Sequence, residues 1–420
     1  MQNRTKGVVI MAVLIAAGET VFLLPFVVAR IFRPTFLDVF GITNLQLGTA
    51  FALYGSIAMA AYFLGGPLAD RFSARRLMTA ALLATSLGGI IFAAIPSLSV
   101  LTVLYGFWGL TSILMFWAAL IRATREWGGI DSQGRAYGLL DGGRGLFAAL
   151  LASISVWIFA SLLPAEVASA TIEQRTAALK QIIWIFTGLV LGVALLVWLV
   201  VPENDPTAKV SNRHKLTLND VRQLLRKRTI WLQAIIVLCA YVGYKATDDF
   251  SLYVSDTFGF HDVAAAHIGT ISFWVRPLAA IAAGFLADRI RSSQVTIISF
   301  VLMFFGSLAI VAGILNPDIY LALIFTIVIT STGIYALRGI YFALFQEAKI
   351  PLAMTGSAVG LVSVIGFTPD IFMGPLMGFL IDRSPGALGH QHVFVVLAVF
   401  STIGLIAAIY FQKVNRAQNS

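Results

Sequence analysis

The feature that most constrains this chain is a series of long apolar segments separated by short polar intervals. A helix needs about 20 residues to cross a hydrocarbon core about 30 Å thick. The segments are too long, and too evenly apolar, for the alternating strands of a membrane β-barrel. We therefore predict an all-α membrane protein with twelve transmembrane helices, at residues 7–29, 45–69, 75–95, 99–122, 135–162, 179–201, 230–255, 264–287, 294–315, 319–343, 353–380 and 390–412.

Composition supports lipid as the solvent of this chain. Hydrophobic residues make up 59% of it and charged residues 12%, whereas soluble domains carry about 25% charged residues. The first apolar stretch follows a short basic segment, but it is longer than the core of a secretory signal and has no cleavage-like site. We expect it to be the first span.

No pattern in the sequence indicates an enzyme, a metal site or a bound cofactor. The five histidines do not share a helix face, and no nucleotide-binding loop or nucleophile motif is present. We expect His390 and His392 to be exposed to solvent in an outer loop. The single cysteine, Cys239, excludes an intrachain disulfide.

The distribution of Lys and Arg predicts the orientation. With the N-terminus inside, 20 basic residues fall on the cytoplasmic side and five on the other, namely Arg30, Arg33, Arg175, Lys180 and Arg383. Cytoplasmic loops are enriched in basic residues, so we expect both termini in the cytoplasm. This asymmetry accounts for the net charge of +9 better than nucleic-acid binding does. The short loops and the lack of targeting extensions favour a bacterial inner membrane.

The longest polar interval divides the chain into two sets of six spans. We predict an N-terminal six-helix bundle at 1–201, a cytoplasmic linker at 202–229 and a C-terminal six-helix bundle at 230–420. The sequence G-x-L-A-D-R occurs at 66–71 and again at 284–289, an offset of 218 residues. Glycines that open spans five and eleven repeat at an offset of 222 residues. Two matches at nearly one offset indicate duplication of a six-helix unit.

G-x-L-A-D-R followed by basic residues, in the loop between spans two and three, resembles the signature of the major facilitator superfamily. The resemblance covers the whole chain and departs from the usual pattern at Ser73, where the family has glycine, and in the second copy, which lacks the full basic tail. It implies a monomeric transporter whose two halves rock about a central cavity that opens to alternate sides. It also implies that the motif locks the inner gate, with Asp70 capping a neighbouring helix or pairing with a basic residue. The expected gating residues are Gly66, Asp70, Arg71, Arg75, Arg76, Gly284, Asp288 and Arg289.

Ionisable residues inside the spans are the main functional candidates, because a charge at membrane depth costs several kcal/mol. Asp141 and Arg144 share a helix face and could form a local ion pair. Lys245 could pair in the same way with Asp248 or Asp249. The candidates for binding substrate are Arg144, Tyr241, Tyr244, Lys245, Arg276 and Arg338, and those for carrying a proton are Glu19, Asp248, Asp249 and Asp370.

Spans one and seven line the cavity in the superfamily that this chain resembles. The polar residues of span seven fall mainly on one face at helical spacing, namely Tyr241, Tyr244, Lys245, Asp248, Asp249 and Tyr253. Such a polar face cannot point at lipid, and tyrosines suit a hydroxylated solute. The glycine repeat of span five, at 134, 138 and 142, predicts close helix packing.

Two readings of the cargo remain open. The first is proton-linked transport of a small polar solute, an organic acid, sugar acid or phosphate ester, with arginines binding the anion and a buried carboxyl group carrying the proton. Carboxylates in the spans outnumber bases five to four, so a neutral or zwitterionic solute is also possible. The second is export of a drug or cationic metabolite by proton antiport, although span five lacks the Gly-Pro motif of such exporters. An uncoupled facilitator, or a receptor that kept the transporter fold, completes the alternatives.

Overall fold

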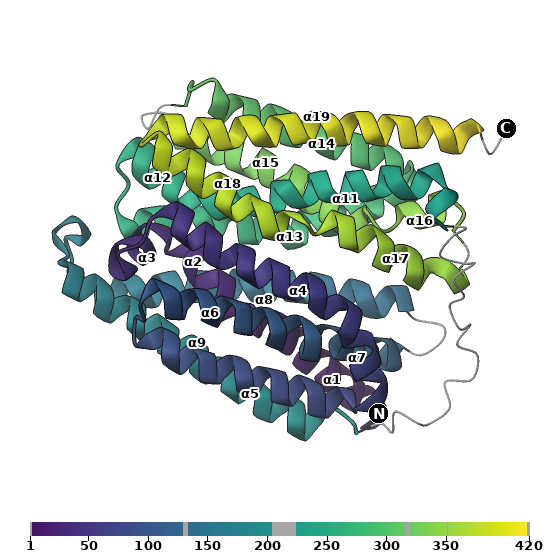
Figure 1. Cartoon of the computed structure of the whole chain (residues 1–420), viewed down its shortest axis with the longest axis horizontal. Coiled ribbons are helices and arrows are strands. Elements are labelled where there is room, and N and C mark those ends of the chain that lie inside the picture. Colours follow the sequence, from purple (N-terminus) through teal and green to yellow (C-terminus); the bar gives the residue numbers. More distant parts are fainter. Residues whose placement is uncertain (1, 129–132, 204–223, 316–319, 351, 418–420) are drawn as a thin grey trace.

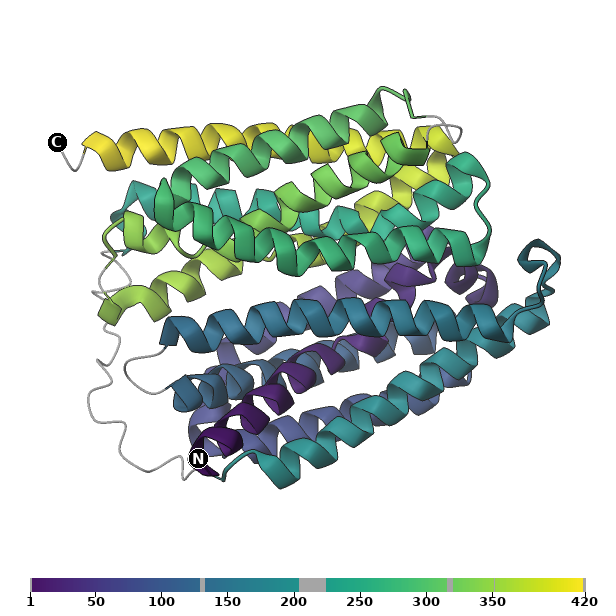
Figure 2. The same ribbon diagram turned by 180° about the vertical axis from the view of Figure 1, so that it is seen from behind.

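The computed structural model describes residues 2–128, 133–203, 224–315, 320–350 and 352–417. Regular structure in these residues is helical throughout. Both termini lie at one end of the bundle (Figures 1 and 2), which we call the terminal side, and the opposite end is the far side. The predicted linker largely falls outside the described residues.

Helices of the first half run back and forth across the bundle. The first span is α1 (Gln2–Thr20), η1 (Leu23–Val27) and α2 (Val28–Ile31), and the short α3 (Arg33–Phe40) follows it on the far side. The remaining spans are α4 (Asn44–Arg71), α5 (Ala74–Ala93), the continuous α6 (Leu98–Gly109), η2 (Leu110–Trp117) and α7 (Ala118–Gly128), α8 (Gln133–Leu162) and, after η3 (Val167–Ser169), α9 (Ile172–Val200).

The second half repeats this arrangement. Its first span is α11 (Arg228–Ala246), η4 (Thr247–Asp249) and α12 (Phe250–Phe258). The others are α13 (Asp262–Arg289), α14 (Ser292–Val311), α15 (Tyr320–Ile340), which the short α16 (Leu344–Glu347) follows, then α17 (Leu352–Gly366) with α18 (Pro369–Arg383), and α19 (Ala387–Ala417).

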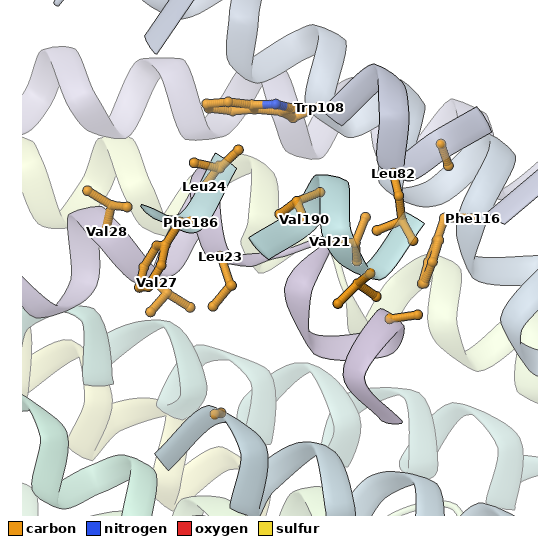
Figure 3. Packing of buried hydrophobic residues seen from close by; sticks show 14 of the residues in the cluster. Val21, Leu23, Leu24, Val27, Val28, Leu82, Trp108, Phe116, Phe186 and Val190 are labelled. Carbon is orange, nitrogen blue, oxygen red and sulfur yellow. The ribbon is translucent and has the colours of Figure 1, made fainter. Parts of the chain in front are cut away.

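In the part of the chain that the structure describes, ten helices are long and apolar enough to cross a membrane, and two bent helix pairs raise the number to as many as twelve. The predicted all-α membrane fold is therefore confirmed. One buried apolar core is built almost entirely from residues 11–201, and a second from residues 224–411. In the first core, η1 and α2 place Leu24, Val27 and Val28 beside Phe186 and Trp108 (Figure 3).

Besides the fourth span with its π-helical η2, three of the described spans are interrupted. In the first span, Pro25 has no N–H to donate, and the backbone widens into a π-turn after a 40° bend. In the seventh, a 3₁₀ turn separates α11 from α12. In the eleventh, predicted as one segment, the helix stops before Pro369 and restarts with that proline in its first turn. Interrupted helices free backbone groups in the middle of the bundle, where transporters build their substrate sites.

The two halves touch closely on the far side and separate toward the terminal side. A Cβ atom added to Gly48 of α4 would lie 2.1 Å from the carbonyl oxygen of Gly374 in α18, so the two backbones are in contact there. On α8, a Cβ at Gly145 would lie 3.5 Å from Pro277 of α13. One and two turns nearer the terminal side on the same face, Gly142 and Gly138 have no such neighbour within 4 Å. The far side is therefore closed.

Candidate functional site

Charged side chains from both halves meet where the first and seventh spans are broken. Glu19 is the last but one residue of α1, just before the bend, Arg30 lies on α2, and Asp248 lies in the 3₁₀ turn of the seventh span. All three are buried. Because a helix interruption exposes polar backbone at membrane depth, these positions tolerate charges better than a continuous apolar helix would.

A chain of polar contacts links the first, seventh and eleventh spans. Arg30 forms an ion pair with Asp248. Lys245 Nζ lies 3.6 Å from Asp248 Oδ2 and 3.5 Å from Asp370 Oδ1. Tyr241 donates a hydrogen bond of 3.0 Å to Asp370 Oδ2. Lys245 therefore lies between two carboxylates, one of which also binds the first half through Arg30.

A second group is centred on Glu19. Its carboxylate lies 3.4 Å from Arg144 Nε and accepts a hydrogen bond of 3.3 Å from Arg276 Nη1. Arg144 Nε donates its hydrogen bond to the carbonyl of Gly18 at 3.0 Å instead, so the contact with Glu19 is an ion pair without a hydrogen bond. Since Arg276 is on α13 and Glu19 on α1, this group also joins the two halves.

Arg338 differs from the other cations of the site because it stacks on tyrosine rings and has no carboxylate partner among the described residues. Its guanidinium carbon lies 3.7 Å from the centre of the Tyr244 ring and 5.6 Å from that of Tyr241, which is a favourable cation–π arrangement. Its Nη1 is buried and has no hydrogen-bond partner. Among the described residues no carboxylate pairs with it. We call these residues the central polar cluster: Glu19, Arg30, Arg144, Tyr241, Tyr244, Lys245, Asp248, Arg276, Arg338 and Asp370.

The sequence pattern of the Major Facilitator Superfamily matches residues 8–368, which is most of the chain. The chain belongs to this superfamily. It is accordingly a multi-pass membrane transporter for a small-molecule substrate and not an enzyme, as predicted.

Several relatives of this superfamily member are known. Inner membrane protein YqcE of Escherichia coli K12 is 27% identical over 387 residues, which cover 90% of this chain and 89% of that protein. Inner membrane protein YihN of the same strain is 24% identical over 414 residues, 96% of this chain and 94% of that protein.

Two solved structures share the fold. One is a variant of the nucleoside transporter NupG, with a TM-score of 0.73 and 16% identity, covering 96% of this chain and 98% of that one. The other is a bacterial homologue of the human lysosomal transporter Spinster in an inward-facing, unoccupied conformation. Its TM-score is 0.73 and its identity 16%, and the match covers 97% of this chain and 98% of that one.

Nine of the ten residues predicted to bind substrate or carry a proton come together in the central polar cluster. The local pair of Arg144 with Asp141 is confirmed at 3.5 Å, and that of Lys245 with Asp248 is confirmed at 3.6 Å. The face predicted for the seventh span, with Tyr241 and Tyr244, does turn toward these charges.

Asp249 lies elsewhere, in a buried group on the far side. The Nδ1 atom of His390 is 2.8 Å from Asp249, and its Nε2 atom is 3.2 Å from Asp256. The expectation that His390 is exposed is wrong, because α19 begins three residues before it and turns its ring against α12, where it is fully buried. A His-to-carboxylate pairing between distant spans has no local sequence signal.

Arg30 is the member of the central polar cluster that sequence reasoning missed. The topology count places it in a far-side loop, but α2 continues to Ile31 and buries it. Two further contacts hold it: its Nη1 donates to the Tyr244 hydroxyl at 3.2 Å, and its backbone carbonyl accepts from Ser251 at 2.9 Å. Arg33, also assigned to the loop, is buried as well and donates to Asn44 Oδ1 at 2.9 Å.

The motif residues lie at the terminal side, where the halves are apart. Arg75 and Arg76 both form ion pairs with Glu203 at the end of the sixth span, whereas Arg71, Asp288 and Arg289 are exposed. The side chains at 66 and 70 lie outside the described residues, and Gly284 has no neighbour within 4 Å of an added Cβ. The gating role of these residues stays a prediction.

The glycine repeat of α8 does not pack as predicted. Gly138 and Gly142 face no neighbouring helix in this conformation, while Gly143 packs against Ile15 of α1, and Gly134 lies outside the described side chains. The repeat thus lies on a face that is open on the terminal side, because the two halves separate there.

Proposed function

We propose that this transporter moves a small organic anion across the bacterial inner membrane by alternating access, coupled to protons. The observation that carries the proposal is the charge balance of the central polar cluster. It holds five cations, Arg30, Arg144, Lys245, Arg276 and Arg338, against three carboxylates, Glu19, Asp248 and Asp370.

The structure reverses the balance that the sequence suggests. Arg30 joins the cluster and Asp249 leaves it for His390. Even when Asp141 at the exposed edge is included, with 71% of its side chain accessible, the described cluster keeps one excess positive charge. A buried excess charge is costly, and an anionic substrate would offset that cost.

Arg338 is the leading candidate for direct contact with the anion. Guanidinium groups bind carboxylate and phosphate oxygens in pairs of hydrogen bonds. Arg338 has an unpartnered buried nitrogen, and stacking on Tyr244 fixes its plane. Arg144 and Arg276 share the carboxylate of Glu19, and Arg144 also contacts the exposed Asp141 at 3.5 Å. Tyr241 and Tyr244 add hydroxyl groups for a hydroxylated solute.

Proton coupling follows from competition for the same cations. An anion that binds Arg144 and Arg276 would displace the Glu19 carboxylate, and one that binds near Lys245 would displace Asp370. A displaced carboxylate in a buried site is unfavourable unless it takes up a proton. Substrate binding and protonation would then favour each other, which is the requirement for symport.

The excess of basic residues on the terminal side supports placing both termini in the cytoplasm. With that orientation, the closed far side and the separated terminal side correspond to a conformation open to the cytoplasm. The inner-membrane names of the two Escherichia coli relatives support the same compartment.

A ligand-induced thermal shift on the detergent-purified protein tests the substrate class. A ligand at 100 times its Kd stabilises the folded state by about 2.7 kcal/mol. We expect stabilisation by members of an anion panel that includes carboxylates, sugar acids and phosphate esters. We expect no stabilisation by neutral or cationic metabolites.

Two variants decide whether the anion acts through the cluster. Arg338→Gln should remove the anion-induced shift, and the matched control Arg228→Gln, at an exposed arginine of α11, should retain it. Stabilisation by lipophilic cations alone, lost in Glu19→Gln, would overturn the proposal in favour of cation export.

A further inference from the structure

The end of α18 carries a third version of the loop motif. Residues 378–383 read G-F-L-I-D-R, which differs from G-F-L-A-D-R at 284–289 in one position only. The first two copies lie on the terminal side, whereas this one lies on the far side, where the chain turns from α18 into α19 (Figure 1). Its aspartate is Asp382.

Asp382 caps a helix of the other half. Its two carboxylate oxygens accept hydrogen bonds from the backbone N–H groups of Asn44 at 3.1 Å and Leu45 at 2.8 Å. These are the first two residues of α4, and the following N–H, of Gln46, is capped by Thr43. A carboxylate at a helix N-terminus satisfies N–H groups that have no partner in the helix, and its charge interacts favourably with the helix dipole.

The glycine of the same motif brings the two helices together. A Cβ atom added to Gly378 would lie 2.4 Å from the carbonyl oxygen of Asn44, so only glycine allows α18 to approach the start of α4 this closely. One turn earlier, Gly374 meets Gly48 in the same way. Arg33 holds Asn44 from the first half through two hydrogen bonds of 3.1 and 2.9 Å to Oδ1.

We propose that Asp382 is a positioning residue of the transport cycle, a latch that holds the far side closed. α4 belongs to one half and α18 to the other, so opening the far side must break both hydrogen bonds to Asp382. Losing the latch therefore destabilises only the conformation that is closed on the far side. This role does not depend on which solute or ion is moved.

The proposed latch and the motif of the second span act in opposite directions. Asp70 is expected to lock the terminal side, so its loss should favour the conformation seen here. Loss of Asp382 should favour the conformation that is open on the far side. A helix cap of this kind changes an equilibrium by about threefold to thirtyfold.

Distance measurement between two spin labels tests the latch. The labels are attached through Glu173→Cys on α9 and Leu388→Cys on α19, both exposed positions on the far side of different halves, in a Cys239→Ser background reconstituted in lipid nanodiscs. We expect Asp382→Ala to raise the ratio of long to short distances about threefold to thirtyfold. Asp382→Asn should give a smaller rise and Asp382→Glu a partial return toward the wild-type distribution.

Two further variants separate a latch from a general loss of stability. Asp70→Ala should lower the population of long distances, and Glu166→Ala, at an exposed far-side carboxylate, should leave it unchanged. Distance distributions of Asp382→Ala and Asp382→Asn that match the wild type, whatever their melting temperatures, would overturn the proposal. So would an increase in Asp382→Ala that Glu166→Ala reproduces.

Discussion

At the scale of single residues, the main polar links between the two halves in the middle of the bundle are ion pairs. Arg30 with Asp248 and Arg276 with Glu19 each join one half to the other in the middle of the bundle. Removing two charges from water costs several kcal/mol per ion, and a single ion pair rarely recovers all of it. Their position at the interface suggests that they serve the transport cycle more than the stability of one conformation.

Glu19 provides the first prediction. Glu19→Gln keeps the shape of the side chain but cannot exchange a proton, so proteoliposomes should lose accumulation of the anion against its gradient while keeping anion exchange. Uptake of the anion found in the thermal-shift panel, measured with and without an imposed proton gradient, gives the result. Asp141→Asn, at the exposed edge of the cluster, is the matched control, and undiminished accumulation in Glu19→Gln would move the proton site to another carboxylate.

The pair of Arg30 and Asp248 provides the second prediction. Arg30→Met removes the ion-pair partner of Asp248 from the first half and leaves the buried carboxylate with Lys245 at 3.6 Å, so it should lower the free energy of unfolding by about 3–5 kcal/mol. Asp248→Leu in the same chain should recover part of that loss, because no uncompensated carboxylate remains. The free energies of unfolding of the wild type, the two single variants and the double variant, measured by thermal unfolding, form a double-mutant cycle. Additive losses would show that the two side chains do not interact.

At the scale of elements, backbone contact between α4 and α18 closes the far side. Gly48, Gly374 and Gly378 remove the side chains that would hold these helices apart. A second link across the far side joins Arg175 of α9 to Asp262 at the start of α13 at 3.0 Å. Closure therefore rests on glycine packing on one side of the bundle and on an ion pair on the other.

The glycine contact gives a prediction with a matched control. The Cβ of Gly48→Ala would lie 2.1 Å from a backbone oxygen of α18, so this variant should disfavour the far-side-closed conformation by about 1–3 kcal/mol. Gly142→Ala has open space in the same conformation and should leave it unaffected. The same pair of spin labels reads both variants, and equal distance distributions in Gly48→Ala and wild type would contradict the packing argument.

At the scale of the whole molecule, the two halves meet around one polar centre, touch on the far side and separate toward the terminal side. Each half has its own apolar core, so the halves can move as units while the few polar contacts between them change. The closed end is the one without the termini (Figures 1 and 2). Which end of the bundle faces the cytoplasm therefore decides the side of the membrane with which this conformation exchanges substrate.

Cysteine labelling in intact cells checks the orientation. In a Cys239→Ser background, Lys413→Cys near the end of α19 should react with a membrane-impermeant maleimide only after the cells are permeabilised. Leu388→Cys, at the other end of the same helix, should react without permeabilisation. The reverse pattern would show that the termini face outward and would invert the assignment of the conformation.

The sequence by itself determined the membrane fold, the family and most of the central polar cluster. Long apolar segments leave a helical bundle as the only arrangement that satisfies the backbone in lipid. A charged residue inside a span, such as Arg144, Arg276 or Arg338, can be recognised from the sequence as a site candidate, because it cannot face the hydrocarbon. Pairs three residues apart, such as Lys245 with Asp248, follow from helix geometry alone.

Tertiary structure decided everything that depends on contacts between distant spans. Arg30 becomes part of the cluster only because the helix continues past the predicted end of the span and meets Asp248, 218 residues later. His390 is buried, and Asp382 caps α4, for the same kind of reason. A single sequence shows the periodicity along one helix but does not give the distance between two helices. Those distances determine both the charge balance of the central polar cluster and the closure of the far side.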